Sequence, residues 1–306
     1  MSDSSRPVSD DDPIRARIAK AVRDVREQTP LAQSFTNFVT INLVANAQLA
    51  IGGTAAMGYL PDDIVDTASI AKASYINVGT LLPFYRDALP QIARGFHKAG
   101  HPWVLDPVAA GIGATRTEIL NAFRFTPPTV VRANASEVLA LTGLWGLDRD
   151  EADGGDVPDA SGNAPAPDRH RPAGVEAVDD VDSAAGAAIR LARSLAVTAP
   201  GGRAAVAVSG PVDLVTDGER TFRLPGGSPL MTKITGAGCS LGGVTATYLA
   251  VTDPLTAALT ASALYNRAGE IAAARAHGPG SFQTELLDAL WNITAENVAA
   301  SPILTA

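Results

Sequence analysis

The sequence predicts an α/β fold with a mostly parallel central sheet and helices on both of its faces. Hydrophobic residues make up 46% of the chain but aromatic residues only 5%, which favours a core of Ala, Val, Leu and Ile, as in layered α/β domains. Short apolar runs also alternate with alanine-rich helical stretches, the pattern of parallel strands joined by helices. The runs are 75–78, 103–105, 130–132 and 204–209, and the stretches include 83–99 and 183–196.

The first elements of this pattern are helical. A helix is predicted over residues 12–28, because apolar residues recur at helical spacing from Ile14 to Val25. Pro13 fits the first turn of that helix. A second helix is predicted over residues 40–49.

The pattern changes after Ser209. Residues 213–216 and 220–224 flank Asp217-Gly218, a turn dipeptide, and therefore predict a β-hairpin. From Ser240 onward the sequence is helical in character.

The chain of 306 residues is long enough to bury a sizeable core without disulfides. We expect a single domain over residues 13–306, preceded by a disordered acidic segment over 1–12. Residues 146–173 are rich in Asp, Gly, Pro and Ala and lack apolar periodicity, so they predict a disordered acidic insertion between two helices. The alternative for this segment is a small hidden domain.

Charge and cysteine content limit the function classes. Most of the net charge of −8 lies in residues 1–13 and 148–172, so the rest of the chain is nearly neutral and offers no nucleic-acid surface. Cys239 is the only cysteine, which excludes an internal disulfide and a cysteine metal cage and fits a reducing compartment. The start of the chain lacks a signal-peptide pattern, and the uncharged stretch 234–252 is too rich in glycine for a membrane span. We expect a cytoplasmic protein that binds neither nucleic acid nor membrane.

The segment Thr235-Gly236-Ala237-Gly238-Cys239 is a candidate phosphate site. Glycines let the backbone approach a ligand closely, and a following helix adds N–H groups and a positive dipole end. The segment is not a nucleotide P-loop, because Lys233 precedes the glycines, and it is not a complete dinucleotide fingerprint. The alternative is that these are structural glycines at a strand–helix junction.

Cys239 stands at the start of that helix. The dipole of a helix start favours a thiolate, so we expect a thiol pKa below the usual value of about 8.5. Such a sulfur could accept a proton from a substrate hydroxyl as its oxygen attacks a γ-phosphate. The alternative is a cysteine that acts only as a small buried hydrophobic residue.

An ordered set of short segments resembles one known family. The segments are 30–31, 36–42, 45–46, 77–81, 104–108 with Gly111, 132–137, 208–213, 232–239 and 278–283. Together they resemble hydroxyethylthiazole kinases, ribokinase-like enzymes of thiamine salvage. The resemblance implies a three-layer α/β/α ribokinase-like fold and ATP-dependent phosphorylation of the hydroxyl of 4-methyl-5-(2-hydroxyethyl)thiazole. It also implies Mg²⁺ as a cofactor and a homotrimer with active sites at subunit junctions.

The resemblance implies specific roles near the glycine turn. Cys239 stands where related kinases carry an aspartate base, and the amides of Gly236, Ala237 and Gly238 would form an anion hole for the transferred phosphoryl group. The residues that would contact the thiazole are Met57, Gly236, Asn37 and Asn42. The alternatives are a core methionine at Met57 and asparagines that cap helices and turns.

The resemblance also implies a nucleotide and metal site. Arg132 and Ser209 match residues that bind ATP, and a guanidinium is a good phosphate clamp. The alternative for Arg132 is a surface salt bridge. The segment from Asn134 to Glu137 resembles the acidic motif that organises Mg²⁺ and phosphate, but it also reads as a helix capping box. Asp106 could act on the metal through water.

Two departures and two rival functions remain open. Gln33 and Phe35 stand where family members often carry histidine and isoleucine, which leaves the substrate preference less certain. A related kinase for a pyrimidine or sugar alcohol is one rival. A non-catalytic module that binds thiazole or nucleotide is the other, and the presence of Cys239, Asp106 and Glu137 argues against it.

Overall fold

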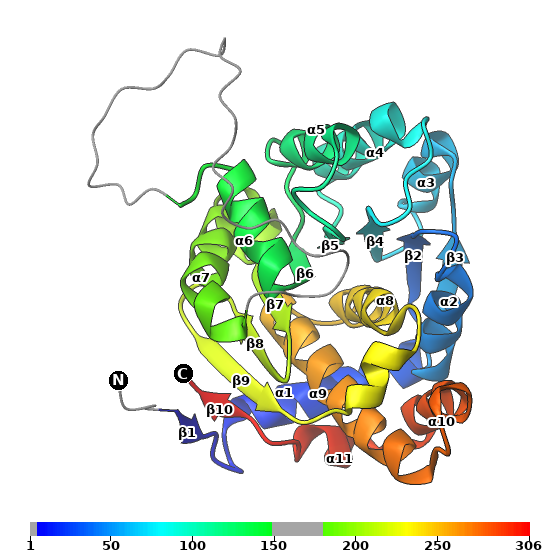
Figure 1. Ribbon diagram of the computed structural model, residues 1–306, viewed down its shortest axis with the longest axis vertical. Coiled ribbons are helices and arrows are strands. Elements are labelled where there is room, and N and C mark those ends of the chain that lie inside the picture. The colour runs from blue at the N-terminus through cyan, green and yellow to red at the C-terminus, as the bar shows by residue number, and fades with distance from the viewer. Residues whose placement is uncertain (1–4, 149–179) are drawn as a thin grey trace.

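A computed structural model describes residues 5–148 and 180–306, and within them ten strands form one sheet (Figure 1). The strand order is β1-β10-β9-β8-β7-β6-β5-β4-β2-β3. The strands are β1 (Arg6–Pro7), β2 (Leu31–Phe35), β3 (Thr54–Met57), β4 (Ala73–Asn77), β5 (Trp103–Asp106), β6 (Val130–Asn134), β7 (Ala205–Ser209), β8 (Val212–Thr216), β9 (Thr221–Pro225) and β10 (Leu304–Thr305).

Helices and two short 3-10 turns connect these strands. The helices are α1 (Pro13–Gln28), α2 (Ile41–Ala50), α3 (Pro61–Thr67), α4 (Tyr85–Ala99), α5 (Ala114–Phe123), α6 (Ala135–Leu144), α7 (Val181–Thr198), α8 (Ala237–Leu249), α9 (Pro254–Arg275), α10 (Pro279–Asn292) and α11 (Ala295–Ala299). The 3-10 turns are η1 (Pro200–Gly202) and η2 (Pro229–Lys233).

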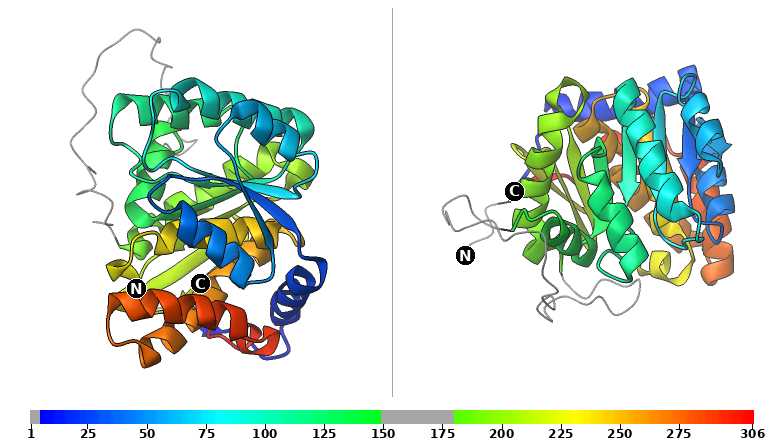
Figure 2. Two further views of the ribbon diagram at one scale, coloured as in Figure 1. Left: turned by 90° about the vertical axis from the view of Figure 1, so that its right-hand side faces the viewer. Right: turned by 90° about the horizontal axis from the view of Figure 1, so that it is seen from above.

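The helices cover the two faces of the sheet in separate layers (Figure 2). Alternation along the strands sends Tyr75 to one face, where it packs with residues of α1, α8 and α9, and Ile76 to the other, where it packs with residues of α4 to α7. The predicted three-layer α/β/α fold is confirmed. In the described residues no helix combines the length and the apolar character that a membrane span requires.

The sheet is parallel in one part and antiparallel in the other. Strands β2 to β7 pair in parallel, whereas β7 to β10 and β1 pair antiparallel. The parallel register places Asn77 beside Asp106 and Asn134 beside Ser209. The carboxyl ends of the parallel strands therefore bring polar side chains together at one edge.

Several predicted elements agree closely with the structure. Helix α1 begins at Pro13, capped by Asp12, and the Asp217-Gly218 hairpin joins β8 to β9. Strand β2 was not predicted, because its residues include buried Gln33 and Ser34 and so lack an apolar run. Strand β3 and helices α3 and α5 were also missed.

The expectation of disorder over residues 1–12 is wrong for residues 5–12. Strand β1 pairs with β10 near the C-terminus, and Val8 is buried and donates its N–H to the carbonyl of Ile303 at 2.8 Å. The guanidinium of Arg15 donates to the carbonyls of Val8 and Ser301. Residues near the two ends of the chain thus pair with each other and form one edge of the sheet. Residues 1–4, and 149–173 of the predicted insertion, lie outside the described residues.

Candidate active site

The glycine turn is held against α2. Gly236 is the N-cap of α8 and has a φ of 92°, the left-handed region that favours glycine. A Cβ at this position would lie 2.9 Å from the side chain of Thr40. The amides that follow Gly236 open the helix, and the first N–H groups of a helix lack partners within it. The turn therefore offers donors to an anion.

The sulfur of Cys239 faces two amide side chains. The Nδ2 atom of Asn77 lies 3.3 Å from Sγ and that of Asn37 lies 3.6 Å away. Burial raises the pKa of the Cys239 thiol above its usual range, and the nearby carboxylate of Asp106 raises it further. The predicted lowering of this pKa is therefore wrong, because desolvation outweighs the favourable groups around the sulfur.

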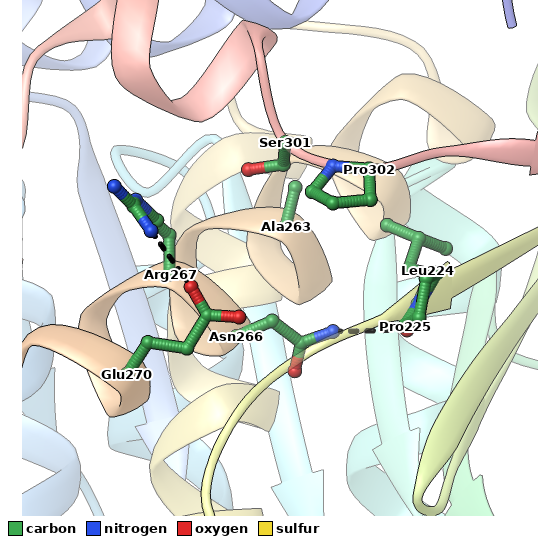
Figure 3. A pocket seen from close by; sticks show the side chains of 8 residues that line it. All are labelled: Leu224, Pro225, Ala263, Asn266, Arg267, Glu270, Ser301 and Pro302. Atoms are coloured by element: carbon green, nitrogen blue, oxygen red, sulfur yellow. Dashed lines mark hydrogen bonds and ion pairs between the residues drawn. The ribbon is translucent and has the colours of Figure 1, made fainter. Parts of the chain in front are cut away.

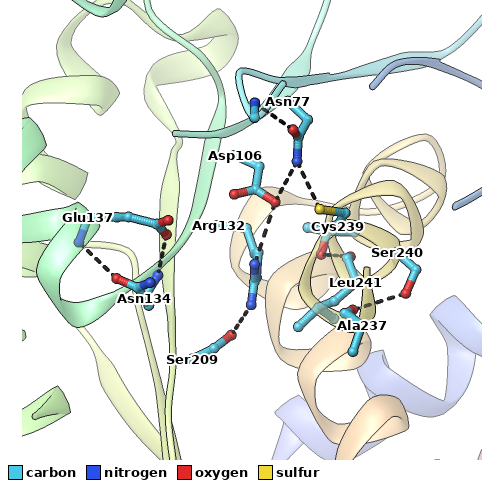
Figure 4. Close-up of polar contacts among 12 residues, drawn as sticks. Asn77, Asp106, Arg132, Asn134, Glu137, Ser209, Ala237, Cys239, Ser240 and Leu241 are labelled. Carbon is cyan, nitrogen blue, oxygen red and sulfur yellow. Dashed lines mark hydrogen bonds and ion pairs between the residues drawn. The ribbon is translucent and has the colours of Figure 1, made fainter. Parts of the chain in front are cut away.

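Asp106 and Arg132 form a buried ion pair beside this sulfur (Figure 4). The carboxylate of Asp106 is fully buried and lies 3.5 Å from Nη1 of Arg132. Its Oδ2 atom accepts hydrogen bonds from the Tyr75 hydroxyl at 2.9 Å and from Nδ2 of Asn77 at 3.1 Å. Burial raises the pKa of this carboxyl. The alternative prediction of a surface salt bridge at Arg132 is therefore wrong, because its ion pair with Asp106 is buried.

Arg132 links this carboxylate to Ser209, the predicted ATP-binding residue at the end of β7. Its Nη2 atom donates to Oγ of Ser209 at 2.8 Å. The resulting network is named here the Cys239 cluster. Its members are Asn37, Tyr75, Asn77, Asp106, Arg132, Ser209 and Cys239.

Asn134 and Glu137 form the capping box at the start of α6. The N–H of Glu137 donates to Oδ1 of Asn134 and the N–H of Asn134 donates to Oε2 of Glu137, both at 2.9 Å. The other carboxylate oxygen accepts from the N–H of Ala109 at 3.0 Å. Burial, together with the smaller effect of the Asp106 carboxylate, raises the pKa of Glu137 to about 7. The capping interpretation is confirmed, and these same contacts hold Glu137 close to Asp106.

The remaining predicted substrate residues differ in position. Asn37 is buried within the Cys239 cluster, and Met57, at the end of β3, packs against the same hydrophobic core as Cys239. Asn42 is exposed on α2, where its Oδ1 accepts from Nδ2 of Asn46 at 3.0 Å. The network therefore includes Asn37 but not Asn42.

Two members of the cluster have no role in the sequence-based predictions. Tyr75 and Asn77 lie on the same face of β4 and both contact Asp106. Their signal is weak, since each is a single polar group within the otherwise apolar run 75–78. Only the β4–β5 register brings them to Asp106.

Two hollows on the described surface lie away from this cluster. One is formed by residues of β9, α9 and the segment after α11, with a cavity volume of about 10 Å³, room for about one water molecule (Figure 3). The other is larger, about 240 Å³, and is lined by α1 and residues 251–253. Neither is lined by a predicted site residue.

Comparison with known proteins decides the family. A sequence model of the Hydroxyethylthiazole kinase family matches residues 22–164 and 170–296. The chain belongs to the hydroxyethylthiazole kinase family. It is 66% identical over 305 residues to a hydroxyethylthiazole kinase of Bifidobacterium longum, covering 97% of this chain and 93% of the relative. A family member from Cereibacter sphaeroides is 41% identical over 272 residues, covering 89% and 92%.

Solved structures agree with this assignment to the hydroxyethylthiazole kinases. The hydroxyethylthiazole kinase protein of Pyrococcus horikoshii superposes with a TM-score of 0.77 at 30% identity, covering 94% of this chain and 98% of that one. A ribokinase-like superfamily protein of Enterococcus faecalis superposes with a TM-score of 0.53 at 12% identity, covering 94% and 91%. The second likeness supports the ribokinase-like fold alone.

Proposed function

We propose that this chain transfers the γ-phosphoryl group of ATP to the hydroxyl of 4-methyl-5-(2-hydroxyethyl)thiazole, a step of thiamine salvage. The observation that carries the proposal is the meeting of Cys239, Asp106 and Arg132 at the glycine turn. This constellation occurs in a chain that is 66% identical to a protein named Hydroxyethylthiazole kinase.

Phosphate is proposed to bind between the turn and Arg132. The amides of Gly236, Ala237 and Gly238 supply N–H donors at the positive end of α8, and the guanidinium supplies a cation. A Cβ at Gly238 would lie 2.6 Å from Nη1 of Arg132, so the turn and the guanidinium are in direct contact. Ser209 would serve the nucleotide by orienting Arg132, and Asn134 by holding the adjacent start of α6.

Cys239 is proposed to receive or orient the proton of the substrate hydroxyl. The raised pKa makes the resting group a neutral thiol. A sulfur that takes part in proton transfer therefore needs donors that stabilise negative charge on it. Asn37 and Asn77 point their N–H groups at the sulfur and meet this need.

The thiazole alcohol is proposed to lie beside Asn37, Asn42, Met57 and Gly236. Asn37 donates through Nδ2 to Asn77, and its Oδ1 is a buried acceptor without a hydrogen-bond partner among the described residues. A buried acceptor of this kind favours a ligand that brings a donor, such as the substrate hydroxyl. Met57 would pack its thioether against the ring.

Mg²⁺ is proposed as the cofactor, held by Asp106 and Glu137. The described residues contain no cluster of three or more His, Cys, Asp or Glu side chains that could bind a metal. However, Mg²⁺ commonly binds through one or two carboxylates together with water and phosphate oxygens. The buried Oδ1 atom of Asp106 has no hydrogen-bond partner in the part of the chain that the structure describes, and it fits this use. Bound there, the ion would neutralise charge on the transferred phosphoryl group.

We also infer a homotrimer located in the cytoplasm. Phe38 and Val39 directly follow Asn37 and are 50% and 58% exposed, which favours a subunit contact next to the site. Light scattering of the purified protein should give three times the mass of one chain. A monomer with full activity would contradict a shared site, and a fluorescent fusion in a bacterial cell tests the location.

Product analysis tests the reaction. The purified chain, ATP, Mg²⁺ and the thiazole alcohol should yield ADP and a product heavier by one phosphoryl group, detected by mass spectrometry. Parallel reactions with a pyrimidine alcohol and a sugar should be slower. Binding of the thiazole without turnover, or faster turnover of another alcohol, would overturn the proposal.

A further inference from the structure

The side chain of Asn77, at the end of β4, contacts four other members of the Cys239 cluster. Its Nδ2 atom lies 3.3 Å from Sγ of Cys239, 3.1 Å from Oδ2 of Asp106 and 2.9 Å from the Tyr75 hydroxyl. Its Oδ1 atom accepts from Nδ2 of Asn37 at 3.0 Å. The side chain is 2% exposed, so these contacts are shielded from solvent.

One backbone group fixes which way this amide points. The N–H of Gly79 lies 2.8 Å from Oδ1 of Asn77, and a backbone N–H can only donate. The oxygen of the amide must therefore face Gly79, and the NH₂ group must face Cys239 and Asp106. Arg116 holds the same loop by donating to the carbonyls of Val78 and Gly79 at 3.1 and 2.6 Å. The amide is thus aimed at the sulfur by the fold itself.

We propose that Asn77 is a positioning residue that holds the sulfur of Cys239 beside the carboxylate of Asp106. The inference rests on the proposed function of the cluster. One amide group spans the two atoms, since its nitrogen reaches both within hydrogen-bond distance. Loss of that amide frees the sulfur to rotate and removes a donor that stabilises negative charge on it.

Kinetics of Asn77→Leu test this role. Leucine keeps the branching and the number of heavy atoms of asparagine and removes its polar groups, including the donor. We expect kcat to fall about 10- to 100-fold, with the KM values for ATP and the alcohol within about 3-fold of the parent. The double variant Asn77→Leu/Cys239→Ala should lose less than the product of the two single losses, because Asn77 acts through the sulfur. Independent, multiplying losses would overturn the proposal.

A second measurement needs no substrate. Cys239 is the only cysteine, so alkylation by iodoacetamide reports on this sulfur alone. The thiolate is the reactive form, so loss of the donor should slow alkylation about 10-fold at a fixed pH. An unchanged rate would overturn the role of Asn77. If the parent forms no phosphorylated product, the proposed function fails, while this rate still decides the role of Asn77.

Ser74→Ala is the matched control. Ser74 lies three residues earlier on β4, is equally buried and bonds Gln33 and His101 on the opposite face. Its loss should leave kcat and the alkylation rate unchanged. Equal effects in both variants would show that β4 is merely loosened. Should Asn77→Leu fail to fold, Asn77→Asp keeps oxygens for Gly79 and Asn37, lacks the donor, and carries the same expectations.

Discussion

Strand β4 separates two buried polar clusters that differ in how completely they are bonded. On one face lies the Cys239 cluster, and on the other lies the Ser74 cluster, formed by Gln33, Ser74 and His101. In the Ser74 cluster the serine hydroxyl lies 2.9 Å from Nε2 of His101 and donates to Oε1 of Gln33 at 3.4 Å. Within the described residues, no side-chain atom of these three residues is both buried and without a hydrogen-bond partner, which is what a structural polar group in a core needs.

The Cys239 cluster keeps unused bonding capacity. Three of its buried atoms have no hydrogen-bond partner within residues 5–148 and 180–306, namely Oδ1 of Asn37, Oδ1 of Asp106 and Nε of Arg132. An unpartnered buried polar atom is costly to the fold, on the order of 1–3 kcal/mol each. Such atoms persist where a ligand completes them. The contrast indicates that substitutions on the first face change catalysis, whereas those on the second change stability.

The largest effect is expected at the sulfur. Cys239→Ala should lower kcat by about 10²- to 10⁴-fold, more than it weakens binding, because it removes the group that receives or orients the proton. Cys239→Asp should keep or raise turnover, because a carboxylate supplies a base. Steady-state kinetics of both variants check this. A Cys239→Ala enzyme with the parental kcat would show that Cys239 takes no part in proton transfer.

Asp106→Asn comes next. The amide keeps the shape of the side chain but loses the charge that faces Arg132 and the proposed metal. We expect kcat to fall about 10²- to 10³-fold. Asp253→Asn is the control, since it makes the same exchange at the N-cap of α9, where asparagine caps equally well. Comparable losses in both variants would contradict a special role for Asp106.

Gly238→Ala should cost activity by crowding Arg132. The added Cβ would lie 2.6 Å from Nη1 of Arg132 and would displace the guanidinium that pairs with Asp106. We expect kcat/KM to fall about 10-fold. Gly186→Ala in α7 places its Cβ 3.4 Å from a guanidinium nitrogen of Arg190, outside the site. That control should keep full activity in steady-state kinetics, and equal losses in both variants would contradict a role for the turn.

His101 should control stability alone. Burial lowers its pKa to about 4, so the folded state holds it neutral while the unfolded chain binds a proton below about pH 6.5. Stability is therefore lost as the pH falls. Between pH 7.5 and 5 this group should cost about 2 kcal/mol of unfolding free energy.

Denaturant unfolding of the parent and of His101→Phe at both pH values isolates this contribution. The parent should lose about 2 kcal/mol more than the variant between the two pH values, while kcat at pH 7.5 stays the same. Other groups, such as Glu137, cancel in the difference between the two proteins. Identical losses would show that His101 is solvated in solution.

Local signals in the sequence determined most of the fold and part of the site. The Asp217-Gly218 turn, the first turn of α1 at Pro13 and the capping box of Asn134 and Glu137 each depend on neighbouring residues, and each forms as predicted. The glycine turn before Cys239 likewise follows from local sequence, because Gly236 adopts a left-handed φ. Hydrogen bonds and backbone angles over a few residues are what a short segment can specify.

Only the tertiary structure decided what surrounds the sulfur. Asn77 and Cys239 are 162 residues apart, and the packing of α8 against β4 makes them neighbours. The direction of the thiol pKa also depended on burial, which no local pattern measures, and so the predicted sign was wrong. The pairing of residues 6–7 with 304–305 is of the same kind, since it joins the two ends of the chain. Desolvation and contacts between distant segments arise from the packed chain as a whole, whereas caps and turns arise within a few residues.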